Sequence, residues 1–249
     1  EITTYLEKTL ASELSANVID LCPVGALTSR PYAFAARPWE LNKVETIDVM
    51  DALGSNIRVD ARGAQVMRVL PRLNEDINEE WISDKTRYAI DGLRRQRLDK
   101  PYARGRDGRL HPVSWDEALK SLAIALRKAK PNAIGAIAGN QADAESLYAL
   151  KSLMTRLGSL NLDCRQDGAK IGGNRAGYLF NSTIAGIDDA DALLIIGSNP
   201  RIEAAVLNAR IRRNWLSSRM PVAVVGPKVD LTYHADFLGQ DPTILGALA

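Results

Sequence analysis

Cys22 is the residue whose surroundings best suit metal chemistry. It is followed directly by Pro23, and Gly25 and Ala26 come shortly after. The proline stops any helix and the glycine allows close approach of backbone to inorganic sulfide, which is how a thiolate is presented to an iron–sulfur cluster. A buried free cysteine at a turn is the alternative that these residues alone leave open.

The number of cysteines limits what this chain can bind by itself. Cys22 and Cys164 are the only two, and the sequence contains no CxxC pair. Because a [4Fe–4S] cluster requires four ligands, the chain cannot hold one alone. It starts at Glu1 and ends within an apolar run, so we expect an excerpt of a longer polypeptide with the other ligands upstream. We expect no disulfide, as in a reducing compartment.

Composition and charge exclude several classes of protein. The 249 residues are 46% hydrophobic and 25% charged, which is normal for a globular protein. A net charge of +2 does not favour nucleic acid as a partner. The basic run Arg94–Arg97 is interpreted as a solvated face or a subunit contact. No apolar run reaches the roughly 20 residues of a membrane span, and we expect no direct membrane insertion.

The stretch from residue 17 to residue 40 resembles the end of the iron–sulfur region in the large iron–sulfur subunit, of the 75 kDa type, of respiratory complex I, NADH:quinone oxidoreductase. The similarity rests on the sequences CPVGALT, PYAF and RPWE. It implies that Cys22 is the last of four thiolates on a [4Fe–4S] cluster. It also implies electron transfer from NADH through iron–sulfur clusters to quinone, with other peripheral-arm subunits as partners. The expected location is the cytoplasmic face of a bacterial inner membrane or the matrix side of the mitochondrial one.

Periodicity predicts the elements that would position this cysteine. Apolar residues at helical spacing predict a short helix from residue 4 to residue 14. Beyond Lys43 the period becomes two, which predicts strands around Val44 to Val49, Ile57 to Val59 and Val66 to Leu70, with a turn at residues 60–63. A small β-rich layer follows from this pattern.

The later part of the chain alternates helices and apolar strands. A capping box at Ser114 to Glu117 starts a helix that lasts until Pro131, and residues 143–157 and 203–215 predict two more. Buried strands are predicted at 133–138, 160–164, 192–196 and 222–225. The fold class is therefore α/β, with a partial doubly wound parallel sheet. We divide the chain into residues 1–40 (end of the cluster region), 41–100 (small β-rich domain) and 101–249 (incomplete α/β domain).

Three of these strands end in glycine, at Gly139-Asn140, Gly197-Ser198-Asn199-Pro200-Arg201 and Gly226-Pro227-Lys228. Carboxyl ends of parallel strands share one edge, where ligands bind. Asn199 could contact a nucleotide and Arg201 a phosphate. Tight strand-to-helix turns also use glycine, so a purely structural role remains open.

Residues 190–201 and 113–119 resemble the molybdopterin oxidoreductases, and together the matches cover nearly everything from Lys43 onward. In that family the loop at 197–201 binds the pterin dinucleotide. The residue aligned with the metal ligand is Ala169, which cannot bind a metal, and Cys164 is interpreted as a thiol at a strand end. We therefore expect a vestigial crevice loop and no molybdenum.

The same family opens its corresponding domain with four cysteines on a [4Fe–4S] cluster. The aligned positions here are Asp48, Asp51, Ser55 and Ser83, whose hard oxygen atoms replace thiolates poorly. This predicts a kept scaffold and a lost cluster. A hard-metal site at Asp48 and Asp51 is the alternative, although acidic residues are common at turns.

Neither histidine offers a catalytic arrangement: His111 precedes Pro112 at a turn, and no nucleophile spacing surrounds His234. The leading prediction is a part of an NADH:quinone oxidoreductase subunit that is mostly scaffold and holds no complete active site. A molybdopterin-dependent oxidoreductase and a purely structural interaction module are the alternatives.

Overall fold

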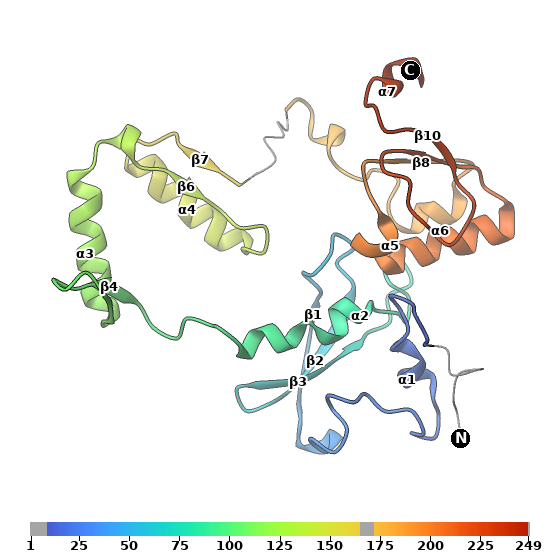
Figure 1. Cartoon of the computed structure of the whole chain (residues 1–249), viewed down its shortest axis with the longest axis horizontal. Helices are drawn as coiled ribbons and strands as arrows, with labels where there is room; N and C mark the ends of the chain where they lie inside the picture. Colours follow the sequence, from blue (N-terminus) through green and yellow to red (C-terminus); the bar gives the residue numbers. More distant parts are fainter. Residues whose placement is uncertain (1–8, 165–171, 249) are drawn as a thin grey trace. The chain divides into compact units, whose positions relative to one another are not determined.

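The computed structural model describes residues 9–164 and 172–248. The chain forms two compact units, which we describe separately (Figure 1). The first combines the amino-terminal part up to residue 95 with residues 179–249, and the second comprises residues 96–178. The division of the chain at residues 40 and 100 stays a prediction.

The amino-terminal part of the first unit contains the short helix α1 (Asn17–Leu21) and the 3-10 turn η2 (Pro38–Glu40). The helix predicted from residue 4 to residue 14 is wrong for residues 9–14, which are not helical; the earlier residues lie outside the described ones. The reason is a tertiary contact. Asp84 accepts hydrogen bonds from Ser15 Oγ (2.6 Å) and from the N–H of Ala16 (2.9 Å). A turn therefore precedes the helix.

The predicted β-rich layer is confirmed as a three-stranded antiparallel sheet in the order β1-β2-β3. Its strands are β1 (Asn42–Ile47), β2 (Asn56–Arg62) and β3 (Gln65–Pro71), so the first strand ends two residues earlier than predicted. Gly63 makes the β2–β3 turn with φ +58°. Ile57 and Val69 pack with the fully buried Ile82. The helix α2 (Asp84–Tyr88) and the 3-10 turn η3 (Ala89–Arg94) follow.

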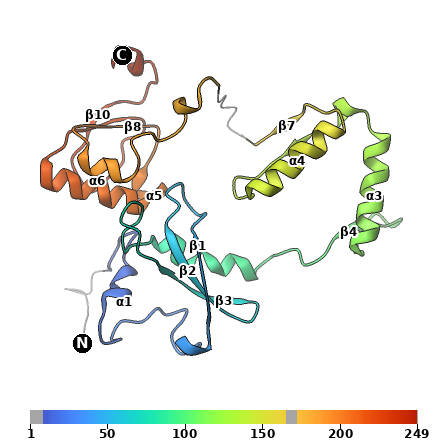
Figure 2. The same ribbon diagram turned by 180° about the vertical axis from the view of Figure 1, so that it is seen from behind.

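The carboxy-terminal part of the first unit is a parallel sheet in the order β10-β9-β8. Its strands are β8 (Leu193–Ile196), β9 (Val222–Val225) and β10 (Asp236–Gly239). Both ribbon views show α6 running along this sheet (Figure 1 and Figure 2). The remaining elements are η6 (Ala185–Asp189), α5 (Pro200–Glu203), α6 (Ala205–Ser218) and α7 (Ile244–Leu248). β8 and β9 were predicted, whereas β10 and α7 were not.

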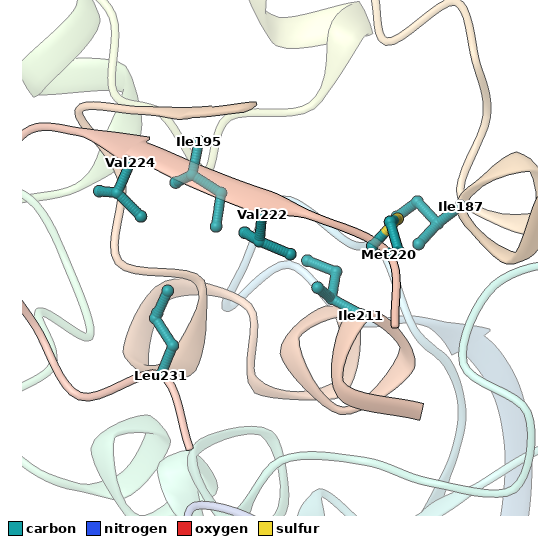
Figure 3. Close-up of a cluster of buried hydrophobic side chains, with 7 residues drawn as sticks. All are labelled: Ile187, Ile195, Ile211, Met220, Val222, Val224 and Leu231. Carbon is teal, nitrogen blue, oxygen red and sulfur yellow. The ribbon is translucent and has the colours of Figure 1, made fainter. Parts of the chain in front are cut away.

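The core of this parallel sheet is aliphatic. Ile211 of α6 lies against the side chains of β8 and β9 (Figure 3). The buried members of the cluster are Ile187, Ile195, Ile211, Met220, Val222, Val224 and Leu231. Burial of each aliphatic side chain contributes roughly 1.5–3 kcal/mol. The sheet therefore packs as a rigid support despite its small size.

Ion pairs join the two sheets of the first unit. Arg210 of α6 is buried and pairs with Glu79 (3.0 Å) and with Asp188 (3.4 Å). Arg213 binds the same two carboxylates at 2.7 and 2.9 Å. Because a buried pair loses much stability when one partner is removed, this cluster fixes the β-rich layer against α6.

The second unit begins with a hairpin of β4 (Tyr102–Arg104) and β5 (Leu110–Pro112), where the sequence predicted only a turn. The capping box is confirmed: Ser114 Oγ accepts the N–H of Glu117 at 3.2 Å, and Glu117 Oε2 accepts the N–H of Ser114 at 3.1 Å. The elements that follow are α3 (Trp115–Lys128), η4 (Pro131–Ala133), β6 (Ala136–Ile137), α4 (Ala144–Arg156), β7 (Leu162–Asp163) and η5 (Arg175–Gly177).

The parallel strands of the described chain belong to two separate sheets. β6 pairs with β7, whereas β8, β9 and β10 form the sheet of the first unit. Of the three glycine-ended strands, two are therefore neighbours in one sheet, and Gly139 follows a strand of the other. These short strands contain too few residues for sequence alone to assign their partners.

Candidate metal centre

Cys22 stands directly after α1, and the position of α1 is set by contacts with the segment around α2. Asn17 exchanges two hydrogen bonds with the backbone of Ile82, at 2.8 and 3.2 Å. At the other end of the helix, the buried Arg87 holds Asp20 at 2.5 Å. Cys22 follows as the carboxyl cap with extended backbone angles. The cysteine is therefore presented from a helix that is anchored at both ends.

The backbone after Cys22 curls around its sulfur. The N–H groups of Leu27 and Val24 face the thiol and lower its pKa, and those of Ala26 and Gly25 add to the effect. Gly25 has φ +67°, a conformation that a side chain disfavours, so glycine permits the curl. Successive N–H groups around one atom form an anion-binding concavity. The surroundings of the half-buried thiol therefore favour its thiolate form relative to an ordinary cysteine.

Cys22 fits one corner of an iron–sulfur cluster and no more. In the part of the chain that the structure describes, no three acidic, histidine or cysteine side chains are grouped closely enough to hold a metal. Cys164 is exposed and follows β7, as a strand-end thiol, in the other unit. The donor set of a cluster at Cys22 would therefore have to include residues beyond these.

Two of the four positions aligned with a second cluster, Asp48 and Ser83, join Thr86 in one buried hydrogen-bonded group of side-chain oxygen atoms. Asp48 is 4% exposed, and its Oδ2 accepts the hydroxyl of Thr86 at 2.6 Å. Ser83 Oγ lies 2.8 Å from the same hydroxyl and also accepts the N–H of Thr86, as the N-cap of α2. Ser55 adjoins this group through its backbone, since its carbonyl accepts the N–H of Asp48 at 2.8 Å, whereas its buried Oγ has no hydrogen-bond partner among the described residues. We call Asp48, Ser55, Ser83 and Thr86 the oxygen cluster.

The fourth position, Asp51, lies near this cluster but is satisfied locally. Its Oδ1 accepts the N–H of Leu53 at 3.0 Å. Burial raises the pKa of Asp51, and the neighbouring Asp48 carboxylate raises it further. Hard oxygen atoms that already hold each other's protons do not suit the soft irons of a [4Fe–4S] cluster, so these residues do not fit that group.

The crevice at the ends of β8 and β9 is narrow and partly acidic. A side chain at Gly226 would lie 3.2 Å from the backbone of Gly197, so the strand ends meet closely. Arg201 is held by Glu13 (3.0 Å) and by Asp230 (2.7 Å), whose carboxylates raise its pKa. Ser198 donates to Glu203 at 2.6 Å.

These contacts do not suit a phosphate group. The guanidinium of Arg201, which the sequence assigned to phosphate, already faces two carboxylates that would repel an anion. Asn199 retains one buried side-chain oxygen without a hydrogen-bond partner among the described residues. Ala169, at the aligned metal-ligand position, lies outside the described residues.

Comparison with protein families decides the affiliation. The model described as molybdopterin oxidoreductase matches residues 97–249, more than half of the chain. The chain belongs to the molybdopterin oxidoreductase family. Two further models match the amino-terminal part of this family member. They are the NADH-ubiquinone oxidoreductase NDSU1/NuoG-like 4Fe-4S domain at residues 41–91 and the ferredoxin-like domain of NADH-quinone oxidoreductase subunit 3 at residues 1–28.

Curated relatives of this chain are considerably longer. The NADH dehydrogenase [ubiquinone] iron-sulfur protein 1, mitochondrial, of Solanum tuberosum is 54% identical over 100% of the chain and 34% of its own length. The mitochondrial NADH-ubiquinone oxidoreductase 78 kDa subunits of Neurospora crassa and Candida albicans are each 56% identical over 98% of the chain, covering 34% and 35% of those proteins. The chain spans about a third of the length of these relatives.

The sequence analysis missed three residues that hold α1 and the oxygen cluster in place. Thr86 lies at the middle of the oxygen cluster, and Asp84 and Arg87 anchor α1, yet none carries a motif. The cap pattern at Ser83 was the one available signal.

Both histidines are exposed; His111 bonds Asp107 at 2.9 Å, and His234 lies 4.0 Å from Asp236. Within the described ranges no helix combines the length and apolarity of a membrane span.

Proposed function

We propose that this chain is part of a peripheral-arm subunit of NADH:quinone oxidoreductase, and that Cys22 ligates a [4Fe–4S] cluster on the route of electrons from NADH to quinone. A bound cluster accepts and donates single electrons with little movement of atoms. The observation that carries the proposal is the position of Cys22, whose pKa nearby backbone N–H groups lower, within a stretch matched by a ferredoxin-like model. Hydrogen bonds to cluster sulfurs are among the means by which proteins set reduction potentials.

The remainder of the chain acts as scaffold in this proposal. Its partners are the other peripheral-arm subunits, and its location is a membrane face, with mitochondrial relatives favouring the matrix side. Ion pairs of Arg210 with Glu79 and Asp188 would keep the β-rich layer and the parallel sheet in register. The three-part division at residues 40 and 100 belongs to the same proposal.

The test replaces Cys22 by alanine in the full-length subunit of the assembled complex. We expect the loss of one [4Fe–4S] electron paramagnetic resonance signal, because three protein thiolates hold such a cluster poorly. Cys164→Ala is the matched control and should leave every signal in place, since that thiol is an exposed residue at the end of β7. An unchanged spectrum for Cys22→Ala would reject the proposal.

A molybdopterin-dependent oxidoreductase is the second candidate. It is favoured by the family match and by the buried, unpartnered side-chain oxygen of Asn199 at the crevice. The carboxylates around Arg201 argue against it. Metal analysis of the full-length protein separates the two: one molybdenum or tungsten per chain supports this candidate, and iron alone supports the first.

A further inference from the structure

A groove of about 780 Å³ lies beside the segment that leads away from Cys22. One wall is the loop from residue 27 to residue 37, and the other is formed by β3 with α2 and η3. Figure 1 shows this loop as the blue trace between α1 and β1. The volume is typical of a site that receives a ligand or an inserted segment.

The loop wall is fastened to the sheet at two points. The Arg68 guanidinium stacks on the Tyr32 ring at 4.5 Å, and Arg62 donates to the carbonyl of Ala35 at 3.2 Å. Tyr32 in turn donates to the carbonyl of Ala36 at 3.1 Å. Stacking of this kind contributes about 0.5–2 kcal/mol. The groove is therefore built into the fold.

Basic residues outnumber acidic ones along the groove. It is lined by five arginines, Arg37, Arg62, Arg68, Arg87 and Arg94, and by three acidic residues, Asp20, Glu40 and Asp91. Arg87 already pairs with Asp20, Arg62 lies 3.8 Å from Glu40, and Arg68 binds the buried Asp60 at 2.7 Å.

Two of these arginines retain their positive charge for an external partner. Among the described residues, no carboxylate lies within ion-pair distance of Arg37 or Arg94; the Arg94 guanidinium donates to the carbonyl of Val66 at 2.5 Å and lies against the Gln65 side-chain amide, neither of which neutralises its charge. Arg87, 5% exposed, also keeps a buried Nε that finds no acceptor in the described part of the chain. A buried donor without a partner costs about 1–3 kcal/mol, so these features indicate a missing acceptor.

An aromatic side chain at the groove adds an apolar anchor. Phe34 lines it, its ring is fully exposed, and its backbone has φ +61°. A bulky residue rarely adopts this conformation, which costs about 1 kcal/mol or more. Rigid aromatic side chains are preferred anchors of protein interfaces.

We propose that the groove receives an acidic stretch of the longer polypeptide, whose carboxylates pair with Arg37 and Arg94 while an apolar side chain packs on Phe34. The choice of the same polypeptide rests on the proposed function. Asp20 of the groove is two residues from Cys22, and Leu27 directs its N–H at the Cys22 sulfur. Because this wall adjoins Cys22, a segment that brings further thiolates to Cys22 is well placed to lie against it, and negative charge is what the wall attracts.

Photocrosslinking in the full-length protein within the assembled complex tests the proposal. With p-benzoylphenylalanine at position 34, irradiation should give an adduct with a peptide of the same polypeptide that lies outside these 249 residues and contains Asp or Glu. An adduct with another subunit, with phospholipid or with a peptide lacking acidic residues would overturn the proposal. So would the absence of any adduct.

Charge reversal adds a quantitative arm. The double variant Arg37→Glu/Arg94→Glu should lower the yield of that adduct about fivefold or more, whereas Arg95→Glu, an exposed arginine outside the groove, should not change it. Equal yields in the two variants would contradict the proposal. If Cys22→Ala leaves all electron paramagnetic resonance signals intact while the expected adduct forms, the assignment of Cys22 to a cluster is rejected and the proposal of an acidic segment in the groove is supported.

Discussion

Two regions of this chain match iron–sulfur models, and they differ in the surroundings of the residues aligned with cluster ligands. Around Cys22 the thiol is half-buried, flanked by the exposed Leu21 and Val24, and surrounded by backbone N–H groups. In the oxygen cluster the side chains of Asp48, Ser55 and Ser83 are 4%, 1% and 3% exposed. The first region is open toward a partner, whereas the second is closed on itself.

The two regions differ in how their buried polar atoms are satisfied. Empty ligand positions would leave a cavity and unpaired polar groups, each costing on the order of 1–3 kcal/mol. Here Thr86 supplies the hydroxyl that joins Asp48 to Ser83, so these side chains are satisfied, whereas the buried Ser55 Oγ has no hydrogen-bond partner among the described residues. The side chains of Asp48, Ser83 and Thr86 are therefore held by one another, whereas the Cys22 sulfur is approached by backbone N–H groups.

Among the predictions that test this comparison, the largest change in the free energy of unfolding is expected at Asp48. Asp48→Ala should lower the free energy of unfolding by about 3 kcal/mol, because the Thr86 hydroxyl and the N–H of Met50 lose their buried acceptors. Urea denaturation followed by tryptophan fluorescence measures the change. Cys22→Ala should cost less than about 0.5 kcal/mol in the same assay, since the side chain is not part of a packed core.

A double-mutant cycle separates the network from a general loss of packing. If Asp48 and Thr86 act through their 2.6 Å hydrogen bond, adding Thr86→Val to Asp48→Ala should cost much less than Thr86→Val alone. Glu45→Ala, in the exposed strand β1, serves as the acidic control and should cost about 0.5 kcal/mol or less. Additive effects of the pair would mean that the oxygen cluster is not a cooperative unit.

A smaller effect is expected at Asp51. Burial raises its pKa, so the ionised carboxylate destabilises the folded state at neutral pH. Asp51→Asn should therefore raise the free energy of unfolding at pH 7 by a few tenths to about 1 kcal/mol. The gain should shrink as the pH falls through the folded pKa of Asp51 and vanish below the unfolded value of about 3.9.

Thermal unfolding between about pH 3.5 and pH 8 provides the measurement, since this range spans the unfolded and the raised pKa. Asp76→Asn is the matched control, because Asp76 is exposed on a turn of the same layer. A gain for Asp51→Asn that grows on acidification would contradict the assigned direction of the shift. It would also indicate that the carboxylate is held by a cation, which would revive the hard-metal alternative.

Sequence alone could predict the local features of both regions and few of their long-range contacts. The residues after Cys22 carry their own signal, because proline, glycine and the curled backbone are local features. The β-rich strands were found through their period, and the capping box through its fixed spacing. Such features depend on neighbours within a few residues, which a single sequence displays.

The rest depends on contacts between distant residues. Thr86 meets Asp48 across 38 positions, and Ser15 meets Asp84 across 69. The second contact replaced a predicted helix with a turn, so tertiary contact overrode local propensity. Arg201 was assigned to phosphate because nothing local reveals that Glu13 and Asp230 reach it. The periodicity of a sequence does not reveal which distant residues pair with one another.

The smallest effect concerns the reactivity of Cys22 itself. Because backbone N–H groups lower its pKa, the rate of alkylation by iodoacetamide in the metal-free chain should reach half its maximum at a lower pH than for an ordinary cysteine. Peptide mass spectrometry after timed labelling measures this profile.

Two glycine substitutions test whether the curl of the loop is the cause. Gly25→Ala strains a residue at φ +67°, and Gly63→Ala strains one at φ +58°; neither new methyl group meets an atom within 4 Å. Both should cost about 1 kcal/mol of stability. Gly25→Ala alone should move the profile of Cys22 toward higher pH, because its N–H groups then turn away from the sulfur. Equal profiles in the two variants would show that the low pKa does not come from the loop, and the contrast between an open thiolate site and a closed oxygen cluster would lose its electrostatic basis.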